Sequence, residues 1–446
     1  MVLDQQDFYI QQTYASLQDS LSRYTNSLSN YPKNIALQAA IKKELQVIKI
    51  ALEKVNNNVV KIATFGLVSR GKSAIVNALV GQYVFNSEPV NGTTKWPKSF
   101  RWMPDDTKVM LEFIDTPGLD EINEIQNSTM SREVAEESDL ILFVISEDIV
   151  ETEYKALIYL KKLLKPIILV FNKIDLYPEK TCLNIYKQLQ EFSKDFKNEE
   201  KLLINIQDIV LVAASPKTIP IKIRNVDGKV KKEVEIQTTQ IKSLRHKILG
   251  VVNNEGRYLL CLNVLLQVKQ AEENIALKTI QILEKDAEYI IKKYVKYKSL
   301  IVTFNPIAVL DICIGLLIDL ALIRKLFYLY ALPITNHNID KLWFQIFFSS
   351  GKLLLSEVFT GLVLSISKTI MMITNVLDKP TAIEIYGTSA ILQGGIAAHS
   401  TYRISKAVQN YLAKSCSWRI LGSSEIIENI LNEANENMMI YSLRLK

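Results

Sequence analysis

The fold is decided by the stretch Gly66-Leu67-Val68-Ser69-Arg70-Gly71-Lys72-Ser73, which matches the spacing GxxxxGK[ST] without a mismatch. An apolar run at 59–65 precedes it and a helical pattern at 74–79 follows it, which is the strand–loop–helix context that this motif requires. Glycines allow backbone N–H groups to turn inward at the start of a helix, where these groups bind phosphate oxygens. The stretch therefore predicts a phosphate-binding loop, or P-loop.

Two side chains of this loop have expected roles in phosphate chemistry. Lys72 is expected to reach the β- and γ-phosphates as a point charge, and the hydroxyl of Ser73 is expected to ligate Mg²⁺. The residues expected to contact a nucleotide in this segment are Gly66, Ser69, Arg70, Gly71, Lys72, Ser73 and Ala74.

A second motif, Asp115-Thr116-Pro117-Gly118, ends the apolar run at 110–114. A carboxylate at the end of a strand can hold Mg²⁺, usually through water. Gly118 allows its N–H to approach a γ-phosphate closely. By itself this motif is only a good β-turn, so its weight comes from its place after the P-loop.

A threonine between the two motifs can complete the metal site. The segment Gly92-Thr93-Thr94-Lys95 offers such a residue, which would ligate Mg²⁺ only when a γ-phosphate is present and would make the loop a switch. Thr94 is the first choice and Thr93 the alternative. The expected metal ligands are Ser73, Thr94 and Asp115, and the expected catalytic residues are Lys72, Thr94 and Gly118.

A third motif, Asn172-Lys173-Ile174-Asp175, selects the base and follows the apolar run Ile167–Phe171. The carboxylate of Asp175 can accept two hydrogen bonds from guanine N1–H and its exocyclic amine, a donor pair that adenine lacks. Asn172 can brace the loops, and the stem of Lys173 can cover the base. Ala214 and Ser215, after the next apolar run, are weaker candidates for a backbone N–H donor to guanine O6.

The order of elements predicts a doubly wound, mostly parallel sheet. Short apolar runs at 59–65, 109–114, 140–145, 167–171 and 209–213 alternate with amphipathic segments. The run 221–236 alternates on each side of Asp227-Gly228, which indicates an inserted hairpin. The expected domains are an N-terminal helical segment at 1–58, a nucleotide-binding domain at 59–252, a long connecting helix at 253–299 and a helical domain at 300–446.

The composition gives no indication of a nucleic-acid-binding protein, a zinc protein or a secreted protein. The net charge is +6 in 446 residues, which is too weak to indicate a nucleic-acid ligand by itself and suits an anionic membrane surface equally well. The four cysteines form no CxxC pair, and with three histidines no zinc pattern appears. The first residues show no signal-peptide pattern.

The motifs together resemble the Era-like branch of the translation-factor-related GTPases over about residues 59–252. The resemblance implies an α/β P-loop GTPase domain that binds GTP or GDP with Mg²⁺. Leu119 stands where Ras-type GTPases place a glutamine that positions water, so the resemblance implies slow hydrolysis unless another group assists. Ser69 stands where some relatives hold potassium with an asparagine, so potassium activation is not expected to carry over.

The tail resembles a helical, membrane-predicted domain of unknown function that follows Era-like GTPases in cyanobacteria, plastids and other bacteria. The matching residues are Asn305-Pro306, Asp311, Leu329-Tyr330-Ala331-Leu332-Pro333-Ile334-Thr335, Gly394-Gly395 and Tyr402. The fold expected for the whole chain is thus the α/β domain, an all-α C-terminal domain and an N-terminal helical extension.

The apolar tail is either a soluble helical bundle or an interfacial or re-entrant membrane domain. Residues 301–323 are long enough to span a bilayer, but they contain Asp311 and Asp319. Each such charge costs about 2.5–3.5 kcal/mol at the centre of a membrane helix. Trp343, Phe344, Phe347 and Phe348 are candidates for a membrane interface.

Three functions remain open from the sequence. The first is a slowly hydrolysing GTP-dependent switch, linked to a membrane through residues 300–446 on its cytoplasmic or stromal side and acting on an unidentified protein effector. The second is a ribosome- or RNA-assembly GTPase, although RNA is not expected because no GxxG loop follows residue 252. The third is a dynamin-like remodelling GTPase that uses the long helices as a stalk. A homodimer is a further expectation.

Overall fold

The structure is a computed structural model of the 446-residue chain. It describes residues 5–28, 34–85, 96–105, 107, 109–118, 125–163, 165–195, 204–224, 230–235, 237–304, 308–331, 363, 380–415, 423–433 and 439. The chain divides into two compact units. The first unit comprises Met1–Leu17, Ile50–Gln267 and Ser423–Lys446, and the second comprises Gln18–Lys49 and Val268–Gly422.

The first unit is built on a six-stranded sheet in the order β2-β3-β1-β4-β5-β6. Its strands are β1 (Val59–Phe65), β2 (Lys98–Trp102), β3 (Met110–Asp115), β4 (Leu140–Ile145), β5 (Ile167–Phe171) and β6 (Ile209–Leu211). All neighbouring pairs are parallel except β2 with β3. The predicted doubly wound α/β sheet is confirmed, and β2 is an antiparallel edge strand that the sequence pattern did not reveal.

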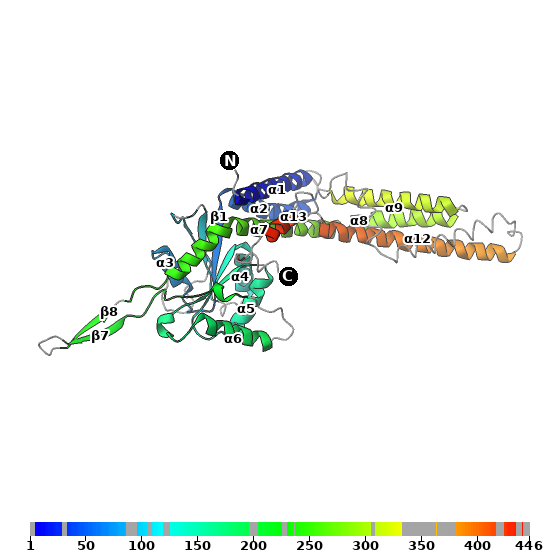
Figure 1. The fold of residues 1–446 in the computed structure, drawn as a ribbon. Helices are drawn as coiled ribbons and strands as arrows, with labels where there is room; N and C mark the ends of the chain where they lie inside the picture. Colours follow the sequence, from blue (N-terminus) through cyan, green and yellow to red (C-terminus); the bar gives the residue numbers. More distant parts are fainter. Residues whose placement is uncertain are drawn as a thin grey trace. The chain divides into compact units, whose positions relative to one another are not determined.

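Helices cover both faces of this sheet. They are α3 (Lys72–Val80), α4 (Ile125–Glu137), α5 (Glu151–Lys162), α6 (Cys182–Asp195) and the first part of α7 (Lys242–Ile282), with the 3₁₀ turns η2 (Ile174–Leu176) and η3 (Ile206–Asp208). Figure 1 shows α3 and α7 on one face and α4, α5 and α6 on the other. The second face encloses a core that includes Phe143, Tyr154 and Phe171. Every residue of β4 is buried, as the continuous apolar composition of an interior parallel strand requires.

A two-stranded hairpin extends from this unit (Figure 1). It is formed by β7 (Ile219–Arg224) and β8 (Val230–Glu235), which pair antiparallel with Arg224 opposite Val230. The expected hairpin is therefore confirmed, while its proposed turn at Asp227-Gly228 lies outside the described residues.

The N-terminal extension consists of two helices, α1 (Gln5–Leu28) and α2 (Ile35–Asn56). Within the first unit, Arg257 of α7 forms an ion pair with Asp7 of α1. Within the second unit, Ser20 Oγ donates to Glu272 at 2.7 Å, and Lys278 Nζ lies 2.6 Å from Glu44. The N-terminal helices therefore pack along α7 in each unit.

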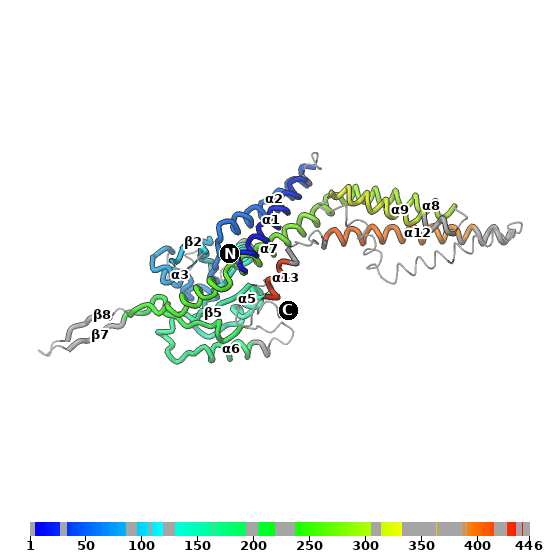
Figure 2. The backbone as a smooth tube through the Cα atoms, turned by 45° about the horizontal axis from the view of Figure 1, so that its top comes forward, coloured from blue at the N-terminus to red at the C-terminus, as the bar shows by residue number. Residues whose placement is uncertain are grey.

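The second unit also contains α8 (Glu284–Phe304), α9 (Ala308–Tyr330) and α12 (Pro380–Ser415), which lie side by side in Figures 1 and 2. The helix α13 (Ser423–Glu433) belongs to the first unit. Lys298 of α8 lies 2.5 Å from the Asp319 carboxylate of α9, and Thr401 of α12 donates to the same carboxylate at 2.9 Å. Burial raises the pKa of Asp319, and the contacts with Lys298 and Thr401 lower it in part.

Two expected long helices are divided in the structure. The helical pattern at 255–299 is shared by α7 and α8, with Leu283 alone between them. The apolar run at 301–323 is also shared, because α8 ends at Phe304 and α9 begins at Ala308. Among the helices that the structure describes, none combines the length and the apolar character needed to cross a lipid bilayer. The aromatic residues proposed for a membrane interface at 343–348 lie outside the described residues.

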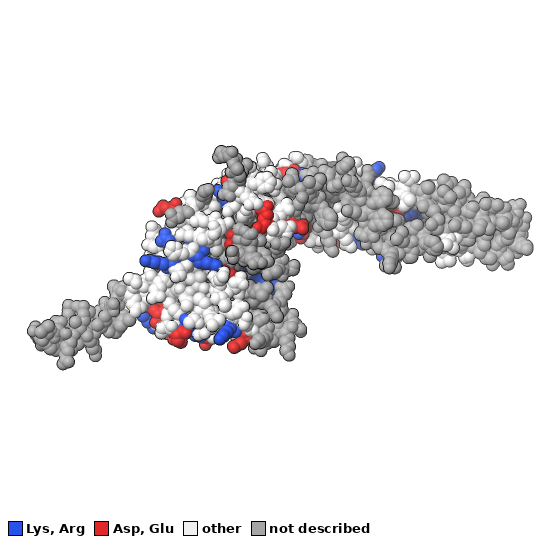
Figure 3. Space-filling model, viewed as in Figure 1, with Lys and Arg blue, Asp and Glu red and all other residues white. Residues whose placement is uncertain are grey.

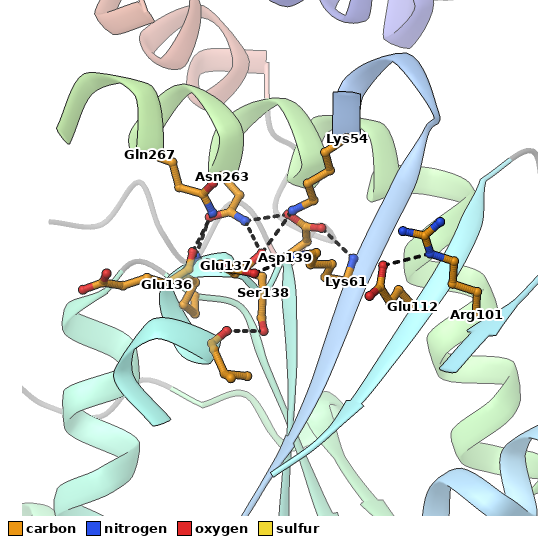
Figure 4. A network of polar contacts seen from close by, with 12 residues as sticks. Lys54, Lys61, Arg101, Glu112, Glu136, Glu137, Ser138, Asp139, Asn263 and Gln267 are labelled. Carbon is orange, nitrogen blue, oxygen red and sulfur yellow. Dashed lines mark hydrogen bonds and ion pairs between the residues drawn. The ribbon is translucent and has the colours of Figure 1, made fainter. Parts of the chain in front are cut away.

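A buried polar network joins α2, α4, α7 and the beginning of β4 (Figure 4). Its centre is Asp139, of which 1% is exposed. Lys54 Nζ and Asn263 Nδ2 each donate to Asp139 Oδ1 at 2.7 Å, and the backbone N–H of Lys61 donates to Oδ2 at 2.7 Å. Lys165, which precedes β5, donates to the carbonyls of Glu136 and Ser138 at 2.6 and 2.9 Å.

These contacts offset an unfavourable burial of positive charge. Burial lowers the pKa of Lys165 to about 7, and it also lowers the pKa of Lys54, against the opposing effect of Asp139. The carbonyls at the end of α4 carry the negative end of the helix dipole, which favours the two ammonium groups there. Asp139 supplies the compensating charge that lets α2 pack against the sheet.

We predict that Asp139→Asn lowers the free energy of unfolding by about 3–5 kcal/mol, because Lys54 then remains buried without a countercharge. The loss is expected to shrink as the pH rises, because burial lowers the pKa of Lys54 and the neutral amine needs no countercharge. Urea denaturation at pH 7 and pH 9.5 measures both effects. The control is Glu151→Gln, which removes the exposed pair Glu151–Lys155 and is expected to cost less than about 1 kcal/mol. Equal stabilities of the two variants would contradict the prediction.

Candidate nucleotide-binding site

The loop between β1 and α3 has the backbone geometry of a phosphate cradle. Gly66 has a φ of +143°, and a Cβ at this position would lie 2.2 Å from the carbonyl oxygen of Val144. Gly71 has a φ of +92° immediately before the first residue of α3. Ser69 adopts a φ of +62°, which is costly for a residue other than glycine. The loop is therefore held in a strained, preformed shape at the N-terminus of a helix.

Lys72 is buried and folds back over this loop. Its Nζ donates to the carbonyls of Gly66 at 3.0 Å and Leu67 at 2.9 Å. Both carbonyls belong to the loop itself, so the ammonium is held against the cradle. Ala74 lies in the first turn of α3, two residues after Lys72.

The expected metal ligands Ser73 and Asp115 are adjacent. Ser73 Oγ lies 2.6 Å from Asp115 Oδ2, and Thr64 Oγ1 donates to Asp115 Oδ1 at 3.1 Å. Burial raises the pKa of Asp115, while Ser73, Lys72 and Thr64 lower it in part. A carboxylate and a hydroxyl at the mouth of the loop are the oxygen ligands that Mg²⁺ prefers. Thr64, which faces Asp115 in the register of β1 and β3, was not identified from the sequence.

Gly118 packs directly against the phosphate loop. A Cβ at this position would lie 2.2 Å from the side chain of Val68 and 2.8 Å from its backbone nitrogen. The second motif and the P-loop therefore touch, as their expected joint role requires. Thr93, Thr94 and Leu119 lie outside the described residues.

Asn172 braces the loops as predicted. Its Nδ2 donates to the carbonyl of Arg70 at 3.0 Å, and its Oδ1 accepts the N–H of Ala214 at 3.1 Å. This second bond corrects the expected role of Ala214, because its N–H is directed to Asn172. The next residue, Ser215, is exposed and remains the candidate donor to guanine O6.

Lys173 contacts the same loop, and Asp175 follows it by two residues in the chain. Lys173 has a φ of +62°, and its Nζ donates to the carbonyl of Ser69 at 2.8 Å, so its stem spans from the third motif to the P-loop. Asp175 Oδ2 accepts the N–H of Lys217 at 3.1 Å and remains partly exposed. The described parts of all three motifs thus converge at the carboxyl end of the sheet, where ligands bind in open α/β folds.

The side chain of Arg70, one of the residues expected to contact a nucleotide, is bound by other residues of the protein. It is buried, and its guanidinium contacts Ser146, Glu147 and Glu153. Its contribution to nucleotide contact is therefore limited to the backbone. Glu153 was not identified from the sequence, where it falls within an ordinary amphipathic helix pattern at 150–164.

The residues present fit a guanine nucleotide with Mg²⁺. The cradle has no room for side chains at Gly66, Gly71 and Gly118, and Lys72 lies over it. Ser73 and Asp115 would hold the metal, and Asn172, Lys173, Asp175 and Ser215 would surround the base.

Comparisons with known proteins agree with this reading. A family model described as "50S ribosome-binding GTPase" matches residues 61–173, and a second, described as a domain of unknown function (DUF697), matches residues 266–436. The chain is 26% identical to GTPase Era of Staphylococcus epidermidis over 246 residues, which cover 51% of this chain and 77% of that protein. It is 30% identical to GTPase Era of Thermoanaerobacter sp. over 139 residues, 29% of this chain and 45% of that protein.

Two further likenesses cover 26% and 43% of the chain. An uncharacterised protein of Methanocaldococcus jannaschii is 36% identical over 134 residues, which cover 26% of this chain and 72% of that protein. A solved structure of Era in complex with MgGDPNP and a segment of 16S ribosomal RNA is 24% identical, with a TM-score of 0.30, over 43% of this chain and 56% of that one. The chain therefore spans only about half of several of its relatives.

The site geometry agrees with the matching families. The chain therefore belongs to the Era-like P-loop GTPases, which are GTP hydrolases that use GTP, GDP and Mg²⁺, and its C-terminal part is a DUF697 domain.

Proposed function

We propose that this protein is a slowly hydrolysing GTP-dependent switch whose C-terminal helical region attaches it to a membrane surface. The observation that carries the switch is that Lys72, Ser73, Asn172 and Lys173 make their contacts within or beside one loop, where Ser73 also binds Asp115. In this proposal the protein lies on the cytoplasmic or stromal side of the membrane, and a protein effector reads the switch.

The chain's own residues supply binding and electrostatic stabilisation. Bound GTP with Mg²⁺ supplies a γ-phosphoryl group that is transferred to water, with negative charge spread over its oxygens. Lys72 provides a fixed positive charge next to those oxygens, and α3 adds its N-terminal N–H groups. Ser73 and Asp115 would hold the metal ion, and Thr64 fixes the Asp115 carboxylate by its hydrogen bond. Leu119 has no group that orients water, which supports slow turnover.

An exposed face of α8 supports membrane attachment. Tyr289, Lys293, Lys296, Leu300 and Phe304 recur at steps of three and four, which places them on one side of the helix. Tyr289 and Phe304 are 73% and 76% exposed. Lysines interleaved with aromatic and aliphatic side chains on one face suit anionic headgroups and the acyl boundary below them. This arrangement favours attachment in the plane of the membrane.

A ribosomal or RNA partner is the second candidate, and the description of the matching family, "50S ribosome-binding GTPase", favours it. In the view of Figure 3, Lys and Arg side chains of the first unit form one short row, and most of the Asp and Glu side chains lie above and below that row. Co-sedimentation with purified ribosomal subunits in each nucleotide state tests this candidate directly. Light scattering with GTP tests the dynamin-like alternative, which requires self-assembly.

Guanine selection is expected to depend on Asp175. Asp175→Asn replaces one acceptor oxygen by a donor, so the affinity for GDP should fall while that for XDP, which offers a carbonyl there, should rise. Competition with a fluorescent nucleotide measures both affinities. If the variant binds GDP as tightly as the parent, the base site is assigned wrongly.

The purified protein is expected to hydrolyse GTP at a rate far below about 10 per second, because Leu119 cannot position water. Lys72→Ala should abolish the remaining activity, since the γ-phosphate loses its main fixed charge. Phosphate release under multiple turnover measures both. Fast turnover of the parent without potassium or a partner protein would refute the proposed role of Leu119.

Attachment to anionic lipid is expected to require the lysines of the α8 face. Lys293→Glu/Lys296→Glu should abolish co-sedimentation with vesicles that contain 30 mol% phosphatidylglycerol. Lys42→Glu/Lys43→Glu, the same charge change on exposed positions of α2, serves as the matched control and should still bind. A parent chain that stays in the supernatant with these vesicles would refute the membrane proposal.

A further inference from the structure

We propose that Glu153 is a positioning residue for the phosphate-binding loop and that it acts through the side chain of Arg70. The inference rests on the proposed function and adds a determinant of phosphate affinity that lies outside the three nucleotide motifs. Glu153 belongs to α5 and stands 83 residues from Arg70 in the sequence.

The contact is a buried ion pair between the loop and α5. Arg70 Nε lies 3.1 Å from Glu153 Oε1, and the Glu153 side chain is completely buried. The other oxygen, Oε2, accepts the backbone N–H of Val150 at 3.2 Å. Both oxygens of Glu153 therefore have defined partners, which fixes the carboxylate at the beginning of α5.

Two further groups from the same region hold the guanidinium. Arg70 Nη1 lies 2.9 Å from Glu147 Oε2 and 3.3 Å from Ser146 Oγ, and both residues follow β4. Glu147 is more than half exposed, so its contribution is weakened by water. Glu153 is the partner with no water contact, and a buried charge requires a buried countercharge. Glu153 is thus the main anchor of the Arg70 side chain.

The backbone of Arg70 is fixed from the opposite direction. Asn172 Nδ2 donates to its carbonyl at 3.0 Å, and a Cβ on the neighbouring Gly71 would lie 2.3 Å from the same atom. Arg70 is therefore held by the β4–α5 segment through its side chain and by the β5–η2 segment through its backbone. The next two residues, Gly71 and Lys72, begin the part of the loop that faces phosphate.

The Arg70–Glu153 contact helps to hold the strained backbone conformation of Ser69. A non-glycine residue with a φ of +62° is retained only when its surroundings hold it there. Ser69 is followed directly by Arg70, so release of the guanidinium allows this part of the loop to relax. Preorganised N–H groups bind phosphate better than mobile ones, because less conformational freedom is lost on binding. The anchor should therefore raise affinity for the phosphates without affecting recognition of the base.

The test compares nucleotide binding by the full-length parent and by Glu153→Gln, which keeps the shape of the side chain and removes its charge. GDP should dissociate about tenfold faster from the variant. The ratio of GDP affinity to XDP affinity should be unchanged, because Asp175 sets that ratio. Loss of fold alone would lower the fraction of competent protein but not the dissociation rate from the remainder. Glu151→Gln, on the exposed side of α5, is the matched control and should dissociate GDP at the parental rate.

A double-mutant cycle tests whether Glu153 acts through Arg70. Arg70→Gln and Glu153→Gln should each accelerate dissociation, and the double variant should be no faster than the faster single variant. The double variant contains no unpaired buried charge, so it carries the test if a single variant fails to fold. Additive effects, or a parental dissociation rate in Glu153→Gln, would overturn this inference alone. A parent chain that does not bind GDP would overturn the proposed function as well.

Discussion

The GTP-binding unit depends on one buried carboxylate, that of Asp139, at the end of the sheet where β4 begins. It accepts hydrogen bonds from Lys54 of α2, the backbone of β1 and Asn263 of α7, so three elements from distant parts of the sequence meet on its two oxygens. An isolated charge in this position would be very costly, and the lysines beside it would be equally costly without it. The network therefore permits only one mutual arrangement of these elements.

Fixing one end of a parallel sheet also places the other end. Strands β1, β3, β4 and β5 run in the same direction from this network, so the loops after them emerge together. The nucleotide motifs lie on those loops, and they contact one another through Asn172, Lys173 and Ser73. Each contact joins a residue of one motif to the backbone or carboxylate of another. The site is preorganised because each loop limits the freedom of the next one.

The sequence predicted those parts of the site whose chemistry is carried by adjacent residues. The P-loop, the Asp115 motif and the Asn172 motif are contiguous, and each follows an apolar strand. What it did not predict depends on distant or weak signals. The pairing of Arg70 with Glu153 joins two segments that no local pattern connects, and β2 has the mixed exposure of an edge strand. The division between α8 and α9 did have a local signal, since Pro306 disfavours helix at the residue before it, but the apolar character of 301–323 obscured it.

Asp319 is a charged residue within an apolar helical run, and the helical unit accommodates it by an internal ion pair. Placing its carboxylate inside a lipid bilayer would cost a large free energy. In this structure the carboxylate is buried in protein, next to Lys298 and Thr401. Because the charge of Asp319 is compensated inside the bundle, it does not restrict what the outer surface of the same helices can contact. Compensation at the centre also fixes the relative rotation of α8, α9 and α12, because only one rotation brings the three side chains together. That rotation leaves Tyr289, Lys293 and Phe304 on the outer face of α8. The polar contact inside the bundle therefore determines which apolar and basic side chains remain available outside it.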